Sequence, residues 1–151
     1  MKRRILLVDD DVAVLLTLKT VLELHQFDVE TASCAREAMA KLATGPYHLV
    51  ITDVRMETED AGLEVIRSAR QQSYNPATAL LTAYPPAHEE RTHGGAESIL
   101  VKPLGTKDLV RQIETLLVRH EDEKQRLRVA QPRTHNKHNS SLNGEAGRKV
   151  S

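Results

Sequence analysis

Short aliphatic segments alternate along this chain with segments of helical periodicity, and this alternation constrains the fold more than any other feature. These segments occupy residues 4–8, 27–32, 49–52, 77–81 and 98–101 and are predicted to be strands. The first is an aliphatic run typical of a buried strand, whereas residues 27–32 alternate apolar and polar side chains. After the first, the apolar residues share one face of a predicted helix: Val14, Leu15, Leu18, Val21 and Leu22. Strands that alternate with helices form a parallel sheet covered on both faces. We therefore predict an α/β open sandwich with a central five-stranded parallel sheet.

Charge and cysteine content restrict the classes of function. The formal net charge is zero, so nothing draws the chain as a whole to nucleic acid or to acidic membranes. Cys34 is the only cysteine, which excludes an intramolecular disulfide and a thiolate zinc cluster. The apolar run after the basic start is too short for a signal peptide or a membrane span. We expect a cytoplasmic protein without a membrane partner.

The character of the sequence changes after residue 119. Residues 1–119 contain the whole alternating pattern and are predicted to form one domain. Residues 120–131 are rich in charge and suit an extension of the last helix, whereas residues 132–151 contain almost no apolar side chain. That composition predicts a disordered polar and basic tail. The residues after 119 are too few and too polar for a DNA-binding module, so we expect no direct DNA binding.

Polar residues stand where the predicted strands end. They follow the first, third, fourth and fifth strands and are Asp9, Asp10, Asp11, Asp53, Thr82 and Lys102. Because the carboxyl ends of parallel strands meet at one edge of a sheet, sites form there. For any one of these residues the competing interpretation is a helix N-cap or a solvated loop charge, and for Asp11 we favour it. For the whole set that interpretation is weak.

The chemistry of this group points to phosphoryl acceptance. Clustered carboxylates repel one another unless a cation lies among them, and hard oxygen ligands around an open site suit Mg²⁺. A carboxylate such as that of Asp53 can attack phosphorus in line and form an acyl phosphate. The Lys102 ammonium and the Thr82 hydroxyl would then donate to the phosphoryl oxygens.

The chain closely resembles the response-regulator receiver domains of two-component signalling. The resemblance covers residues 3–119 and rests on five motifs: Leu6-Leu7-Val8-Asp9-Asp10-Asp11, Val50-Ile51-Thr52-Asp53-Val54-Arg55-Met56, Gly62-Leu63-Glu64-Val65-Ile66, Leu81-Thr82-Ala83-Tyr84 and Val101-Lys102-Pro103. Their order and spacing together are more specific than any single motif. The resemblance implies a flavodoxin-like (βα)5 fold with the strand order 2-1-3-4-5.

The same resemblance implies the residues of a metal site. Asp9 and Asp10 match the acid pair of the family, with Asp10 as the direct ligand of Mg²⁺. Asp53 matches the phosphoacceptor, which is also a metal ligand. The backbone carbonyl of Arg55 matches the group that completes the coordination of the metal.

Three further residues match the groups that contact the phosphoryl moiety. Thr82 matches the switch hydroxyl, Ala83 the small residue beside the phosphoryl group, and Lys102 the phosphoryl-binding cation. A protein of this kind catalyses only its own phosphorylation and dephosphorylation, so we do not expect an enzyme with a separate substrate.

Three differences from the family pattern concern the transmission of a signal. Glu57 stands where the family has proline, in an acidic loop that is one residue longer than usual. Ile99 replaces the switch aromatic three residues before the lysine. The segment over residues 85–95 has no large apolar residue, so we predict a short or distorted fourth helix.

The leading hypothesis is a phosphorylation-controlled switch. A sensor histidine kinase or a phosphotransfer protein would supply the phosphoryl group, and an unknown partner protein would receive the output in place of a fused DNA-binding domain. A weak homodimer remains open. The alternative is a receiver-fold interaction module that acts independently of phosphorylation. A hydrolase with Asp9 and Asp11 as its paired carboxylates is disfavoured, because the chain has no room for a cap domain.

Overall fold

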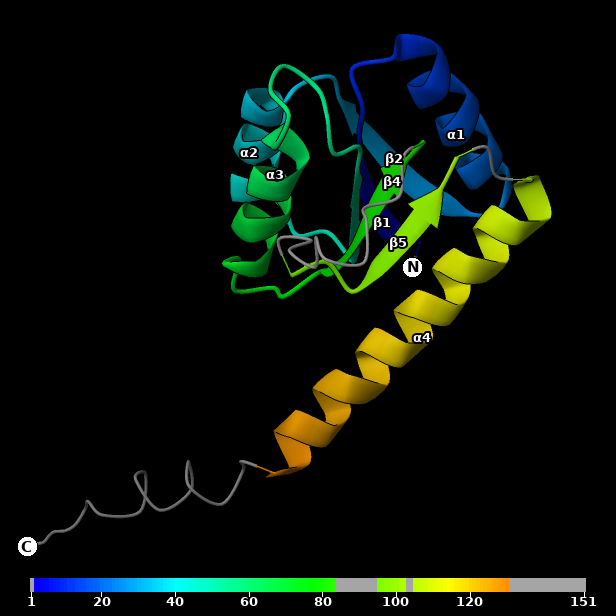
Figure 1. The fold of residues 1–151 in the computed structure, drawn as a ribbon. Helices are drawn as coiled ribbons and strands as arrows, with labels where there is room; N and C mark the ends of the chain where they lie inside the picture. Colours follow the sequence, from blue (N-terminus) through cyan, green and yellow to red (C-terminus); the bar gives the residue numbers. More distant parts are fainter. Residues whose placement is uncertain (1, 84–94, 103–104, 131–151) are drawn as a thin grey trace, which may run out of the picture. The chain divides into compact units, whose positions relative to one another are not determined.

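The computed structural model describes residues 2–83, 95–102 and 105–130. Within these ranges, five strands form one parallel sheet in the order β2-β1-β3-β4-β5 (Figure 1). The strands are β1 (Arg3–Val8), β2 (Phe27–Ala32), β3 (Leu49–Thr52), β4 (Ala77–Thr82) and β5 (Ser98–Val101). The helices are α1 (Val12–Leu24), α2 (Ala35–Ala43), α3 (Ala61–Arg70) and α4 (Thr106–Ala130). The predicted fold class and strand order are confirmed.

Apolar side chains cover both faces of the sheet, because successive residues of a strand point to opposite faces. In β1, Ile5 and Leu7 belong to a core cluster that includes buried residues of α1 and of α4 up to Leu117. Leu6 and Val8 belong to the opposite cluster, which includes buried residues of α2 and α3. All four side chains are at most 1% exposed. The continuous aliphatic run of β1 thus has the pattern of a strand buried on both sides.

The register of the sheet brings the polar strand ends to one edge. Val8 of β1 pairs with Thr52 of β3, so the residues that follow them, Asp9 and Asp53, leave neighbouring strands at the same level. Thr82 of β4 pairs in the same way with the last residue of β5, and Lys102 follows directly. The carboxyl edge of the sheet therefore collects the predicted site residues.

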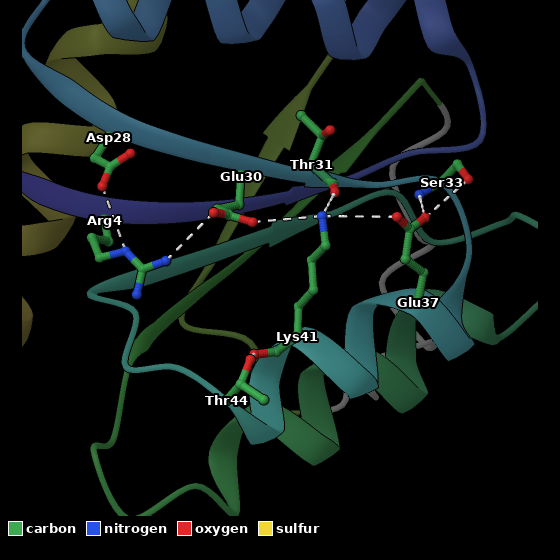
Figure 2. Close-up of polar contacts among 8 residues, drawn as sticks. All are labelled: Arg4, Asp28, Glu30, Thr31, Ser33, Glu37, Lys41 and Thr44. Atoms are coloured by element: carbon green, nitrogen blue, oxygen red, sulfur yellow. Dashed lines mark hydrogen bonds and ion pairs between the residues drawn. The ribbon is translucent and has the colours of Figure 1, made fainter.

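Ion pairs link β1, the edge strand β2 and helix α2 (Figure 2). Arg4 lies 3.6 Å from Asp28 and 3.7 Å from Glu30, and Lys41 of α2 lies 3.5 Å from Glu30 and 3.8 Å from Glu37. These side chains are between 31% and 53% exposed, so each pair contributes little to stability by itself. Their charges do protect β2, an edge strand, from pairing with another chain.

The chain divides into two compact units, Met1–Leu117 and Val118–Ser151. The last helix continues to Ala130 and so includes most of the extension suggested for residues 120–131. The predicted fourth helix lies outside the described residues, apart from Gly95, and so does the tail over residues 132–151. In the described part of the chain, no helix is long and apolar enough to cross a membrane.

Candidate functional site

Backbone hydrogen bonds hold Asp53 in place at the end of β3. Its N–H donates to the Val8 carbonyl at 2.8 Å, and its own carbonyl accepts from the Thr52 hydroxyl at 2.9 Å. The side-chain Oδ1 accepts from the Val54 N–H at 2.8 Å, which orients the carboxylate. Because Thr52 is fully buried, this hydroxyl needs an internal acceptor, and the Asp53 carbonyl provides it.

Gly62 lies directly against the backbone of Asp53. A Cβ atom on Gly62 would lie 1.8 Å from the Asp53 carbonyl oxygen and 2.7 Å from the Val54 Cα. The Gly62 N–H donates to the Val54 carbonyl at 2.8 Å. Glycine at this position therefore allows α3 to begin in contact with the segment that carries the phosphoacceptor candidate.

Three carboxylates form an acidic cluster, defined here as Asp9, Asp10 and Asp53. Each offers an oxygen atom, and these oxygens lie within 4.8 Å of one another. Asp9 is 1% exposed, and its Oδ1 accepts from the Asp11 N–H at 3.0 Å. Asp11 instead caps α1, because its Oδ1 accepts from the N–H groups of Ala13 and Val14. The N-cap interpretation of Asp11 is confirmed.

Lys102 supplies the positive charge of the site. Its backbone N–H donates to the Thr82 carbonyl at 2.8 Å, which continues the pairing of β4 and β5 by one residue. Its Nζ lies 2.8 Å from Asp9 Oδ2 and 3.6 Å from Asp53 Oδ2. In this structure the ammonium group is therefore closer to the buried acid than to the predicted phosphoacceptor.

The negative charges of the acidic cluster are only partly compensated within the site. Burial, together with the charge of Asp9, raises the pKa of Asp53, although Lys102 counteracts this effect. Burial also acts to lower the pKa of Lys102, but its hydrogen bond to Asp9 and the charge of Asp53 outweigh burial and raise that pKa. One ammonium group thus compensates the cluster only in part, and a further cation would relieve the remaining repulsion.

The donor set of the acidic cluster fits Mg²⁺. Carboxylate oxygens are the hard ligands that this ion prefers, and Asp10 is exposed, which leaves room for bound water. Arg55 follows Asp53 by two residues in an exposed loop, where its backbone carbonyl is the predicted additional ligand. The residues present therefore suit the metal that the sequence predicts.

The structure places Thr82 and Ala83 at the carboxyl edge of the sheet and Ile99 within β5. Thr82 is the last residue of β4 and is 5% exposed, and Ala83 follows it at the surface. Ile99, which stands at the position of the switch aromatic, lies in β5 and is half-buried. Tyr84 lies outside the described residues.

Sequence reasoning missed one contact of the site. The Glu57 carboxylate, from the acidic loop after Asp53, accepts a hydrogen bond from the Ala35 N–H at the start of α2, at 2.9 Å. The sequence showed that Glu57 is unusual for the family but gave no partner for it. No local signal could have identified that partner, because the two residues are 22 positions apart.

This fold, with an aspartate cluster and a lysine at the carboxyl edge of its sheet, defines the class of protein. The family model of the response regulator receiver domain matches residues 5–114, and the chain belongs to this family.

Relatives and solved structures agree with this assignment. The transcriptional regulatory protein CpxR homolog of Haemophilus influenzae is 39% identical over 77% of this chain and 51% of its own length. The alkaline phosphatase synthesis transcriptional regulatory protein PhoP of Bacillus subtilis is 31% identical over 80% of this chain and 51% of its own. The chain thus spans about half the length of the curated relatives it matches.

Two solved receiver structures show the same fold. A CheY-like receiver domain protein of Methanospirillum hungatei has a TM-score of 0.74 and 29% identity, over 82% of this chain and 99% of that one. The response regulator TrrA of Thermotoga maritima, solved in complex with Mg(2+)-BeF, has a TM-score of 0.68 and 32% identity. That match covers 76% of this chain and 98% of TrrA.

Proposed function

We propose that this receiver domain is a signalling switch that accepts a phosphoryl group on Asp53 in the presence of Mg²⁺. The observation that carries the proposal is the position of the Asp53 carboxylate, which lies with Asp9 and Asp10 in the acidic cluster and 3.6 Å from the Lys102 ammonium. The donor would be the phosphorylated imidazole of a histidine kinase or phosphotransfer protein. The phosphorylated state would be read by a partner protein that docks on the domain.

The chemistry follows from the groups at the carboxyl edge. A carboxylate oxygen of Asp53 attacks phosphorus in line, and the bond between phosphorus and the imidazole nitrogen breaks. The electron pair of that bond returns to the imidazole, and the new bond makes an acyl phosphate of Asp53. The hydrogen bond from the Val54 N–H holds the carboxylate in one orientation during the attack. No proton has to leave Asp53, because the nucleophile is the ionised carboxylate.

Other groups of the chain stabilise the transferred phosphoryl group. Lys102 would move its ammonium group from Asp9 towards the phosphoryl oxygens, a short movement because both acids already lie within 3.6 Å of it. The Thr82 hydroxyl and the small side chain of Ala83 would border the same group. Mg²⁺, held by Asp9, Asp10, Asp53 and the Arg55 carbonyl, would neutralise charge that develops on the phosphoryl oxygens. The TrrA structure in complex with Mg(2+)-BeF supports this assignment of the metal.

The proposal is tested by incubation with Mg²⁺ and a small phosphodonor, followed by intact-mass measurement. We expect a base-labile mass gain of one phosphoryl group in the parent protein and no gain in Asp53→Asn. Asp11→Asn is the matched control, because it removes a neighbouring charge while asparagine keeps the N-cap of α1. This control should be phosphorylated like the parent.

Two outcomes would contradict the proposal. Absence of any mass gain in the parent would favour the interaction module that acts without phosphorylation. A gain that persists in Asp53→Asn would show that another residue accepts the group. The parent protein is also incubated with the phosphodonor without Mg²⁺, and we expect this omission to abolish the mass gain.

A further inference from the structure

The first turn of α2 lacks a cap from its own N-cap residue. Cys34 occupies that position with an extended backbone, and its side chain makes no capping hydrogen bond. The first N–H groups of a helix have no partner within the helix and need an external acceptor. The Ala35 N–H finds one in the Oε2 atom of Glu57, at 2.9 Å. Glu57 thus acts as a cap that comes from the loop after Asp53.

A second contact secures the N-terminal side of the same helix. The Glu37 carboxylate accepts from the Ser33 N–H at 2.8 Å and from the Ser33 hydroxyl at 3.2 Å (Figure 2). Glu37 also pairs with Lys41, which joins it to the ion pairs on the β2 edge. The start of α2 thus has side-chain contacts of its own, and the hydrogen bond from Ala35 to Glu57 ties the loop after Asp53 to this helix.

The loop after Asp53 is held at two points on either side of Arg55. On the N-terminal side, the Val54 carbonyl accepts from the Gly62 N–H at 2.8 Å. On the C-terminal side, Glu57 binds the Ala35 N–H. Between these points, the Met56 side chain packs against the core cluster of α2 and α3. The backbone of Arg55, whose carbonyl is the predicted additional metal ligand, thus lies between two anchors.

From this arrangement we infer that Glu57 is a positioning residue for the metal site. Its hydrogen bond to α2 holds the Arg55 carbonyl where it can complete the coordination of the ion. The inference rests on the proposed function, because it assigns Glu57 to the same site. It also gives a role to the residue that departs most clearly from the family pattern in this loop.

A glutamate suits this role on physical grounds. A hydrogen bond to an ionised acceptor is stronger than one between neutral groups, and a negative charge at a helix N-terminus is favourable. The coupling must also be reciprocal: if the contact favours metal binding, then metal binding favours the contact by the same factor. Two independent measurements follow from this reciprocity, one on the metal and one on the Ala35 amide.

The first measurement compares Mg²⁺ affinities by calorimetric titration of the full chain. Glu57→Ala should weaken Mg²⁺ binding about tenfold, the lower end of the range for residues that support metal ligands. Glu57→Gln keeps an acceptor oxygen and should retain most of the Mg²⁺ affinity that Glu57→Ala loses. Glu59→Ala is the matched control, since it removes the same charge from an exposed position in the same loop. We expect a change below about twofold for the control, because its charge is screened by solvent.

The second measurement follows hydrogen exchange of the Ala35 amide by NMR in the parent protein, with and without Mg²⁺. Mg²⁺ should slow this exchange, and the effect should disappear in Glu57→Ala. This readout does not depend on phosphorylation. It also keeps the inference testable if a variant folds poorly, because the parent alone provides it.

The outcomes separate the inference from the function on which it rests. If the parent does not bind Mg²⁺ at all, the proposed function fails. If the parent binds Mg²⁺ but Glu57→Ala and Glu59→Ala weaken binding equally, only charge matters and the positioning role is refuted. Exchange of the Ala35 amide that is unchanged by bound Mg²⁺ would refute it as well, while leaving the phosphoacceptor assignment intact.

Discussion

Gly62→Ala tests whether the backbone around Asp53, the proposed phosphoacceptor, depends on a glycine contact. The added Cβ would lie 1.8 Å from the Asp53 carbonyl oxygen and 2.7 Å from the Val54 Cα. Real Cβ atoms essentially never approach other heavy atoms within 3.0 Å, so the two segments must separate by about 1.2 Å. The obstructing atoms belong to the backbone and cannot rotate away as a side chain could. The hydrogen bond from Gly62 to Val54 would lengthen with this movement.

The expected loss of stability is the balance of three effects. Overpacking costs about 1–3 kcal/mol. Weakening the hydrogen bond between Gly62 and Val54 costs about 1 kcal/mol more. Alanine is favoured over glycine in a helix by about 1 kcal/mol, which offsets part of the cost. We expect a net decrease of about 2 kcal/mol in the free energy of unfolding, or about 8 °C in Tm for a domain of this size.

The assay is urea unfolding followed by far-UV circular dichroism, which suits a protein that contains no tryptophan. Gly105→Ala is the matched control, because among the described residues beyond its chain neighbours the nearest heavy atom to the added Cβ is Asp108 Oδ2, at 4.0 Å. Gly105 directly precedes α4, and its carbonyl accepts from the Leu109 N–H as that of an N-cap residue does. Alanine there reduces the freedom of the unfolded chain but is a poorer N-cap residue than glycine, so these effects offset each other and a change within about 0.5 kcal/mol is expected. A Gly62→Ala protein as stable as the parent would refute the reasoning. An equal loss in both variants would show that the contact is not the cause.

Three further predictions concern the charges and hydrogen bonds around the same framework. Burial and the charge of Asp9 raise the pKa of Asp53 in the folded protein. Without metal, the folded state therefore gains stability from protonated Asp53 below the ordinary carboxyl pKa, and it loses this stability as the pH rises through the raised pKa. In EDTA, Asp53→Asn should therefore be more stable than the parent at neutral pH and should lose this advantage at about pH 4. Urea unfolding at both pH values checks this prediction, and a variant less stable than the parent at neutral pH would contradict it. Lys102→Met removes the cation 2.8 Å from the buried Asp9 carboxylate and should lower the free energy of unfolding by about 3 kcal/mol; a loss below about 1 kcal/mol would argue against the pairing. Tyr74→Phe deletes the hydroxyl that donates to the Leu42 carbonyl at 2.8 Å and should cost about 1 kcal/mol in the same assay, and unchanged unfolding would count against that hydrogen bond.

The architecture could be predicted because its signals are local in the sequence. The aliphatic run of β1 is buried on both faces, as a central strand of a parallel sheet must be. The apolar positions of α1 repeat with the helical period, which a reader can detect within one segment. The strand order could not come from such signals, and the family resemblance provided it. The helix predicted over residues 85–95 and the tail over residues 132–151 remain predictions, since apart from Gly95 they lie outside the described residues.

The members of the acidic cluster could also be predicted, but their contacts could not. Asp9 and Asp53 follow strands, and the topology of a parallel sheet brings strand ends together. Which acid the Lys102 ammonium approaches more closely depends on side-chain conformation, and the structure places it nearer Asp9. The close approach of Gly62 to Asp53 likewise depends on where α3 begins in space.

The sequence by itself therefore determined the sheet, its carboxyl edge and the residues that meet there, because periodicity and strand ends are properties of short segments. Only the tertiary structure decided how the loop after Asp53 is held. Glu57 meets Ala35 because α2 and this loop converge at the edge of the sheet, although 22 positions separate the two residues along the chain. A contact between a loop and a helix distant in the sequence depends on the path of the backbone in space, and no local pattern encodes that path.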